Sequence, residues 1–258
     1  MTFVTFGGAD HRELLAQCLA SLYLTWPRLP QLRIVSDGSL DAATAGRDLA
    51  WWPGSWELLS WQKLAPGLRR RGHDGLVRFA EREPMGRKMA AVAATALDGP
   101  TLYSDVDVLW FREPSGLAEL AERPASGAPR LVMSEDCYPA YDPALVPGRL
   151  PHLAVPPFYC AGLLFAQGDF LAAAGVADLL DAAAERGIGL TEQTIFAEAD
   201  RRLGGGCWPR DEIALSEDDR FSLRPSFHGR SWAARHYVGQ VRHLFWRDAL
   251  ALRLGLRP

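Results

Sequence analysis

The stretch TLYSDVDVLWF, residues 101–111, combines an apolar run with two acidic residues, Asp105 and Asp107. It follows the turn Asp98-Gly99-Pro100 and a helix expected from about Met85 to Leu97, so the apolar part is predicted to be a buried strand. Side chains alternate along an extended chain, which places both carboxylates on the same side. Two carboxylates held together repel each other unless a cation neutralises them, and their sequence neighbours include no basic residue. A hard divalent ion, Mg²⁺ or Mn²⁺, is the natural partner, because both ions favour oxygen ligands.

An Asp-x-Asp pair can equally well cap a turn or face solvent. Here the pair follows a helix-turn-strand unit and stands at the carboxyl end of an apolar strand. That edge is where ligands bind in open parallel sheets, so the position favours a functional site.

The chain before this stretch alternates strands and helices. Thr2 to Phe6 is predicted to be a strand, and Asp10 with Glu13 resembles a capping box for a helix through about Leu24. Leu32 to Ser36 is a second expected strand, and Asp41 is expected to cap a short helix. This β-α-β-α order indicates an α/β fold in which helices cover a parallel sheet.

The remaining segments are predicted from their patterns of apolar residues. The segment from Trp51 to about Glu83 is expected to be irregular, with one strand near 56–59 and then an Arg/Gly loop. Further strands are expected at 131–133 and 161–166, and a long surface loop over 139–157. Helices are expected at 170–184, at 192–203 and at the C-terminal end, and the three glycines 204–206 are expected to form a helix exit.

Composition excludes several classes of protein. The 258 residues are 48% hydrophobic, enough for a substantial core, and the formal net charge of -3 argues against nucleic acid as a partner. The four cysteines are scattered without a C-x-x-C pair, which argues against a zinc site or a disulfide framework. We find no signal-peptide pattern and no apolar run of membrane-spanning length, and therefore expect a cytoplasmic protein, from a bacterium with a GC-rich genome by its composition.

Several stretches, in order, carry a resemblance to a known family. They are Thr5-Phe6 and Asp10 at the start, Asp37, Gly86-Arg87-Lys88, Tyr103 to Asp107, Phe158 to Phe165, Glu192-Gln193, and His236-Tyr237-x-Gly239-x-x-Arg242. Together they resemble the glycosyltransferases of the GT-A fold, and among these the retaining family 8 of the glycogenin and galactosyltransferase type. Two positions depart from the family pattern: Cys160 stands where the family usually has Asn, and Arg242 replaces Lys, which keeps the charge but changes the shape of a phosphate contact.

The resemblance implies a Rossmann-like, mixed but mainly parallel sheet flanked by helices, and a role for each matching residue. Asp105, Asp107 and His236 would hold Mn²⁺ or Mg²⁺, and Gln193 and Glu192 would be the catalytic pair. The residues that would bind the donor are Thr5, Phe6, Asp37, Lys88, Ser104, Asp105, Gly239 and Arg242. The implied donor is a nucleotide-diphosphate sugar, with a UDP-hexose favoured, and the sugar would pass with retention to a glycan, lipid or small-molecule acceptor.

The resemblance covers nearly the whole chain and implies one domain over residues 1–258. Residues 1–110 would form the nucleotide-binding half, and residues 111–258 the acceptor half with the C-terminal metal and diphosphate motif. The C-terminal amphipathic stretch is expected to be a docking helix, with acceptor or peripheral membrane contact as the alternative.

Other functions stay open at this stage. Cys160 in place of Asn favours a sugar-nucleotide-binding protein with a decayed catalytic centre. A sugar-1-phosphate nucleotidyltransferase has a related fold, but Phe6 to Asp10 lacks the extended Gly-rich loop with Arg and Lys that grips a triphosphate. An aspartyl-phosphate phosphatase needs its Asp-x-Asp at the end of the first strand, whereas this pair lies in mid-chain.

Overall fold

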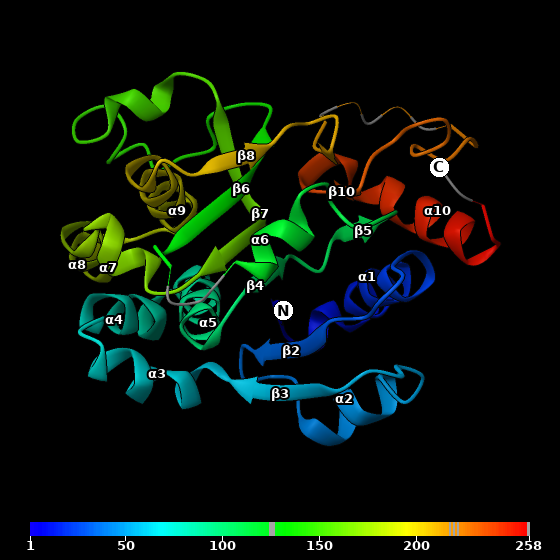
Figure 1. The fold of residues 1–258 in the computed structure, drawn as a ribbon, viewed down its shortest axis with the longest axis horizontal. Coiled ribbons are helices and arrows are strands. Elements are labelled where there is room, and N and C mark those ends of the chain that lie inside the picture. The colour runs from blue at the N-terminus through cyan, green and yellow to red at the C-terminus, as the bar shows by residue number, and fades with distance from the viewer. Residues whose placement is uncertain (124–126, 217, 219, 221, 257–258) are drawn as a thin grey trace.

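The computed structural model describes residues 1–258 except 124–126, 217, 219, 221 and 257–258. Within the described residues, seven strands form one sheet in the order β3-β2-β1-β4-β7-β6-β8, and only β7 runs antiparallel to its neighbours. The strands are β1 (Thr2–Gly7), β2 (Gln31–Ser36), β3 (Trp56–Ser60), β4 (Thr101–Ser104), β6 (Arg130–Asp136), β7 (Phe158–Gln167) and β8 (Gly206–Trp208). The predicted α/β fold with a mixed, mainly parallel sheet is confirmed (Figure 1).

Alternating side chains send each strand's apolar residues to two separate cores. Val4 and Tyr103 face one core, while their neighbours Phe3 and Leu102 face the other, as expected for strands buried on both sides. The first core is completed by α3 (Trp61–Arg70), α4 (Asp74–Arg82), α5 (Pro84–Asp98), α7 (Phe170–Ala174), α8 (Ala177–Arg186) and α9 (Gly189–Leu203). The second is completed by α1 (Arg12–Thr25), α2 (Ala42–Asp48) and α6 (Leu117–Glu122).

A second, three-stranded sheet brings the C-terminal part of the chain to the end of β4. Its order is β5-β10-β9, with β5 (Val108–Trp110), β10 (Ala234–His236) and β9 (Ile213–Ala214). β10 runs antiparallel to β5 and pairs His236 with Val108. The amide of Tyr237 then donates to the carbonyl oxygen of Asp107 at 2.9 Å. This small sheet therefore places His236 beside the Asp-x-Asp pair.

The C-terminal helix α10 (Arg242–Arg253) follows directly and packs against α1 (Figure 1). Its buried side chains, Leu244, Phe245 and Leu252, form a third core with Leu109 of β5. This packing confirms the expected docking helix. Among the residues that the structure describes, no helix is both long and apolar enough to cross a membrane.

The prediction of an irregular segment up to Glu83 is wrong, because 61–82 forms helices α3 and α4. Trp61, Ala65 and Leu68 are buried at helical spacing, but Pro66 lies inside α3 and conceals that pattern. In α4 the buried residues include Leu76, Val77, Phe79 and Ala80, so the amphipathic period was present in the sequence.

Three other predictions need correction. Asp10 is not part of a capping box: it lies in a 3-10 turn, and α1 begins at Arg12 without a side-chain cap. The helix predicted over 170–184 is two helices, since Gly175 adopts a positive φ of 62° between α7 and α8. The segment 139–157 is not simply a surface loop, because Leu145 and Leu153 are buried in the first core. The predicted Asp41 cap is confirmed, with its carboxylate accepting from the amide of Thr44 at 2.8 Å.

Candidate functional site

Asp105 and Asp107 lie in the short turn between β4, which ends at Ser104, and β5, which begins at Val108. The amide of Asp105 donates to the carbonyl oxygen of Gly162 on β7 at 2.7 Å, and the carbonyl oxygen of Asp107 accepts from Tyr237. Strand alternation is therefore not what brings the two acids together, as the sequence had suggested, because the chain turns between them. Their convergence is nevertheless confirmed.

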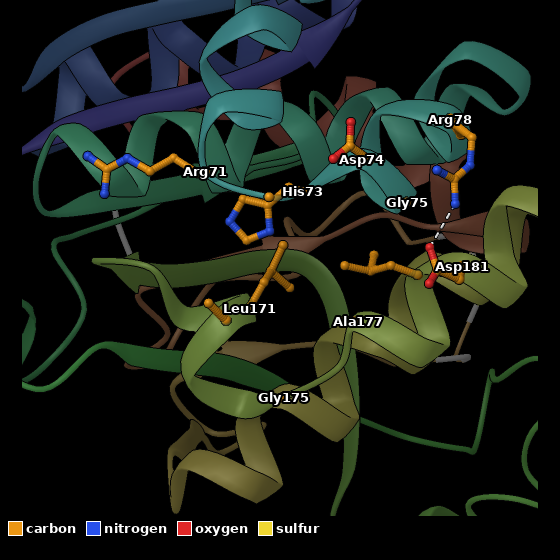
Figure 2. Close-up of a pocket in the computed structure, with 12 residues that line it drawn as sticks. Arg71, His73, Asp74, Gly75, Arg78, Leu171, Gly175, Ala177 and Asp181 are labelled. Carbon is orange, nitrogen blue, oxygen red and sulfur yellow. Dashed lines mark hydrogen bonds and ion pairs between the residues drawn. The ribbon is translucent and has the colours of Figure 1, made fainter.

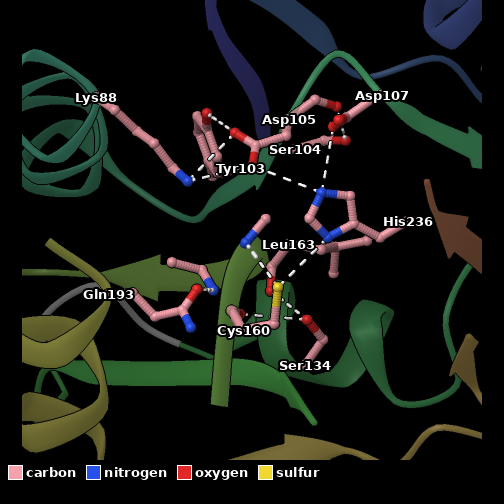
Figure 3. Close-up of polar contacts among 12 residues, drawn as sticks. Lys88, Tyr103, Ser104, Asp105, Asp107, Ser134, Cys160, Leu163, Gln193 and His236 are labelled. Carbon is pink, nitrogen blue, oxygen red and sulfur yellow. Dashed lines mark hydrogen bonds and ion pairs between the residues drawn. The ribbon is translucent and has the colours of Figure 1, made fainter. Parts of the chain in front are cut away.

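Asp105, Asp107 and His236 form a cluster of potential metal ligands. One ligand atom from each residue lies within 4.8 Å of the others. His236 Nε2 is 3.2 Å from Asp107 Oδ1 and 3.8 Å from Asp105 Oδ2 (Figure 3). Asp107 and His236 are buried and Asp105 is half-buried. Two carboxylate oxygens with one imidazole nitrogen suit Mg²⁺ or Mn²⁺, so the side chains fit the predicted ion.

Basic residues far away in sequence surround the two acids. Lys88 Nζ on α5 lies 3.2 Å from the carboxylate of Asp105 and 3.2 Å from Glu192 Oε1. Arg242, at the start of α10, donates to Asp107 Oδ2 at 2.7 Å. Asp105 and Asp107 therefore lack basic neighbours only in the sequence. In the folded protein Lys88 pairs with Asp105, and Arg242 pairs with Asp107.

Burial and these charge pairs shift the protonation equilibria of the cluster. Burial would raise the pKa of Asp107, but His236 and Arg242 outweigh it and lower that pKa. Burial would likewise lower the pKa of Lys88, yet Asp105 and Glu192 raise it. For Glu192 burial prevails over the opposing charge of Lys88 and raises the pKa to about 7. Asp107 and Lys88 therefore stay charged at neutral pH, whereas burial favours the neutral form of Glu192 much more than that of a solvent-exposed carboxyl.

A pocket of about 450 Å³ opens beside this cluster. Asp105, Asp107, His236, Lys88 and Arg242 all contribute to its lining. The rest of the lining comes from the carboxyl ends of β1 and β2, the first turns before and in α1, the start of α5, and the segments after β4 and β10: Phe6, Gly7, Gly8, His11, Leu14, Asp37, Pro84, Met85, Arg87, Val106 and Val238. The structure thus brings the predicted donor-binding residues Phe6, Asp37, Lys88 and Arg242 and the predicted metal ligands to one cavity.

Three predicted donor contacts do not line this pocket. Thr5 is fully buried on β1, and Ser104, also fully buried, donates through Oγ to the carbonyl oxygen of Asp105 at 2.9 Å. Gly239 adopts a positive φ of 62° in the turn before α10 and so helps to place Arg242. The direct donor contacts expected for these three residues remain predictions.

The predicted catalytic pair lies at the start of α9. Glu192 is buried behind Lys88, with which it pairs. The side-chain amide of Gln193, labelled in Figure 3, is held at both ends. Its oxygen accepts from the amide of Ala161 at 3.1 Å, and its nitrogen donates to the carbonyl oxygen of Ala140 at 2.9 Å. Gln193 therefore has a fixed orientation beside β7, and the catalytic role of the pair remains a prediction.

Two contributors to the site were missed in the sequence. Tyr103 donates from its hydroxyl to Asp105 Oδ1 at 2.5 Å, and its ring lies 5.0 Å from Lys88 Nζ. Gly162 leaves room for the imidazole of His236, since a Cβ there would lie 2.2 Å from its Cε1 atom. Tyr103 stands two positions before Asp105, a spacing that offered a weak signal. Nothing in a single sequence could reveal the contact of Gly162 with residue 236.

A separate cleft of about 390 Å³ lies between the start of α4 and the α7–α8 turn (Figure 2). Three of its polar side chains pair with protein partners: His73 Nε2 lies 2.9 Å from Asp169, and Arg78 lies 2.8 Å from Asp181. No residue of the Asp-Asp-His cluster lines it. We therefore do not assign the candidate site to this cleft.

No family model matches the chain, and no curated protein matches it. Solved structures do match it. The galactosyltransferase LgtC, in complex with donor and acceptor sugar analogues, is 14% identical over 97% of this chain and 96% of its own, with a TM-score of 0.51. The bifunctional glycosyltransferase WbbM is 10% identical over 96% of this chain and 49% of its own, with a TM-score of 0.57.

The glycosyltransferase GlyE of Streptococcus pneumoniae TIGR4 is also 10% identical, over 96% of this chain and 60% of its own, with a TM-score of 0.57. The chain thus spans about half of WbbM and more than half of GlyE. These similarities confirm the GT-A fold that the sequence predicted.

Proposed function

We propose that this protein is a metal-dependent glycosyltransferase that moves a sugar from a nucleotide-diphosphate donor to an acceptor. The observation that carries the proposal is the Asp105–Asp107–His236 cluster. It lies at the carboxyl edge of a GT-A sheet and borders a pocket whose lining includes the basic side chains of Lys88 and Arg242. The pocket's volume, about 450 Å³, is in the range of small-molecule sites.

The lining residues suggest where each part of a nucleotide-sugar donor would lie in the pocket. Phe6 offers an apolar ring and Asp37 a carboxylate to a nucleotide base at the ends of β1 and β2. Lys88 and Arg242 offer charge-assisted hydrogen bonds to a diphosphate. A divalent cation held by Asp105, Asp107 and His236 would supply Lewis-acid stabilisation of the leaving diphosphate. Lys88 and Arg242 now pair with Asp105 and Asp107, and each would have to give some of its hydrogen bonds to phosphate oxygens instead.

Retention of the anomeric configuration is the finer proposal for the reaction. Cleavage of the sugar–phosphate bond gives the sugar oxocarbenium character, which nearby oxygens stabilise. Glu192 is the buried carboxylate closest to Lys88, and the fixed amide of Gln193 lies beside β7. These positions support the proposal that the two residues orient the sugar or stabilise its positive charge. An NMR assignment of the product anomer tests this, and an inverted product would contradict it.

The donor and acceptor classes follow from the same resemblance. LgtC, which shares the fold, was solved with donor and acceptor sugar analogues, and we propose a UDP-hexose as the donor here. The acceptor is a glycan, lipid or small molecule. Trp246, Leu250 and Leu254 are exposed on or next to α10, which supports the proposed peripheral contact with a membrane surface.

A specific observation favours a second candidate, a sugar-nucleotide-binding protein without catalysis. Cys160 occupies the position of the family's Asn and contacts His236 rather than opening toward a sugar. Such a protein would bind donor and metal but would show no turnover.

Calorimetry with UDP and GDP, with and without Mn²⁺, followed by a donor-hydrolysis assay, distinguishes the candidates. We expect Mn²⁺-dependent binding of UDP and slow hydrolysis of a UDP-sugar. Binding without turnover on any of a panel of nucleotide sugars would favour the second candidate.

The metal assignment has its own test in Asp107→Ala. This change removes one ligand and leaves Arg242 and His236 without their carboxylate partner, so metal-dependent binding should be lost while the circular dichroism spectrum is kept. Donor affinity that survives this change in the presence of Mn²⁺ would contradict the assignment.

A further inference from the structure

The imidazole of His236 is held on three sides within the candidate metal site. Its Nε2 atom faces Asp107 at 3.2 Å, and its Nδ1 atom lies 3.3 Å from Cys160 Sγ (Figure 3). The ring also covers Gly162 so closely that no Cβ would fit there. His236 and Cys160 are each 4% exposed, so both side chains are largely shielded from solvent.

The sulfur of Cys160 is itself fixed in position. Its strand β7 pairs with β6 at Ser134, and Ser134 Oγ donates to the carbonyl oxygen of Cys160 at 3.3 Å. The amide of Gly162 lies 3.4 Å from Sγ and donates to it. A backbone N–H can only donate, so the sulfur is an acceptor in this contact. His236 Nδ1 faces the same sulfur at 3.3 Å, and a neutral ring that binds an ion through Nε2 carries its proton on Nδ1, where this sulfur can accept from it.

We propose that Cys160 is a positioning residue that selects the tautomer of His236. By accepting a hydrogen bond from Nδ1–H, the sulfur leaves the Nε2 lone pair available to a metal ion. The partner of one ring nitrogen sets which nitrogen carries the proton, and such partners orient metal-binding histidines. The inference rests on the proposed function, because it assigns His236 as a ligand. It also gives a role to the Cys that replaces the family's Asn.

Loss of the acceptor has a defined consequence. Without Sγ, Nδ1–H would be buried without a partner, whereas Nε2–H could bond to Asp107. In the tautomer that carries the proton on Nε2, this nitrogen has no lone pair with which to bind a metal ion. Removing the partner of a ligating histidine typically lowers metal affinity about 10- to 100-fold, and we expect a loss of this size for Cys160→Ala.

The test compares Cys160→Ala with Cys160→Ser, which restores a smaller acceptor, and with Cys207→Ala. Cys207 lies on β8, is partly buried and takes no part in the metal cluster, so it controls for loss of a buried thiol. Mn²⁺ affinity is measured by calorimetry, and thermal melting confirms that each variant is folded. We expect weakened binding in Cys160→Ala, partial recovery in Cys160→Ser and unchanged binding in Cys207→Ala. Wild-type affinity in Cys160→Ala, or an equal loss in Cys207→Ala, would overturn the proposal.

A second readout does not depend on catalysis. Nitrogen-15 spectra of the imidazole, recorded with Mg²⁺ and also in ion-free protein at a pH where the ring is neutral, identify the protonated nitrogen. With Mg²⁺ bound, wild type should carry the proton on Nδ1, and in the ion-free protein Cys160→Ala should carry more of it on Nε2 than wild type does. Equal populations of the Nε2–H tautomer in ion-free wild type and ion-free Cys160→Ala would overturn the inference. A protein that keeps the Nδ1 proton but binds no divalent ion would instead contradict only the proposed function.

Discussion

Gly162 shows how a single residue constrains the site, because the space above its Cα is filled by His236. A Cβ at this position would lie 2.2 Å from Cε1 and 2.5 Å from Nδ1 of the ring. Gly162→Ala should therefore displace the imidazole from Asp107 and reduce Mn²⁺ affinity at least tenfold. Overpacking of this kind should also lower the free energy of unfolding by about 1–3 kcal/mol. Calorimetric Mn²⁺ titration and urea denaturation measure the two effects.

Gly206→Ala is the matched control for this change. Gly206 also lies in a strand, β8, but a Cβ there would meet no atom within 4 Å among the described residues. Its metal affinity should equal that of wild type. If Gly162→Ala also bound Mn²⁺ like wild type, His236 would not be a ligand in the arrangement described.

For single residues, the sequence identifies the candidate metal ligands better than the residues that hold those ligands in position. Asp105 and Asp107 could be identified from residue type and position at a strand end, and His236 from a resemblance over several motifs. Tyr103 had only a weak signal, its spacing of two positions from Asp105, and Gly162 had none, because its role depends on a distance between two segments. The contact of Gly162 with His236 joins residues 74 positions apart, and only the pairing of β10 with β5 creates it.

The helix α9 carries a buried acid, Asp200, whose burial should make stability depend on pH. Asp200 is 1% exposed, and its Oδ1 has no hydrogen-bond partner among the described residues. Burial raises its pKa to about 7, against a smaller opposing effect of Arg201. Because the folded pKa lies above the unfolded one, this group disfavours the folded state increasingly as pH rises from about 4 to about 7.

Asp200→Asn should remove that contribution. We expect the variant to be more stable than wild type at pH 7 by on the order of 2 kcal/mol, and little changed at pH 4. Urea denaturation across this pH range measures the difference. Glu192 on the same helix also has a pKa of about 7, so the variant's free energy of unfolding should still depend in part on pH. Asp211→Asn, at an exposed position, is the control, and an equal gain in that variant would contradict the explanation.

Elements were predictable where their pattern was long or flanked by clear turn residues. The helix predicted from Met85 to Leu97 and the strand at 131–133 both exist, as α5 and β6. The three-stranded sheet was not predicted as a unit, because β9 and β10 have only two and three residues and show no alternation long enough to detect. That sheet is nevertheless the element that completes the site.

The whole molecule is organised so that its two ends meet at one pocket. Phe6 and Asp37 come from the first strands, whereas His236 and Arg242 come from the last strand and helix, and all four line the same cavity. The predicted division at residue 110 separates these two groups. A ligand that contacts both groups would tie the ends of the chain together and should stabilise the entire fold.

Thermal melting tests this expectation directly. A ligand present at 100 times its dissociation constant stabilises the folded state by about 2.7 kcal/mol. For a chain of this length each kcal/mol raises the melting temperature by about 2–4 °C, so UDP with Mn²⁺ should raise it by about 5–10 °C. UDP alone and Mn²⁺ alone should each have a smaller effect, because the diphosphate and the acids need the ion between them. In Asp107→Ala the combined effect should fall to that of UDP alone, and an undiminished shift in this variant would show that the nucleotide binds without the proposed metal.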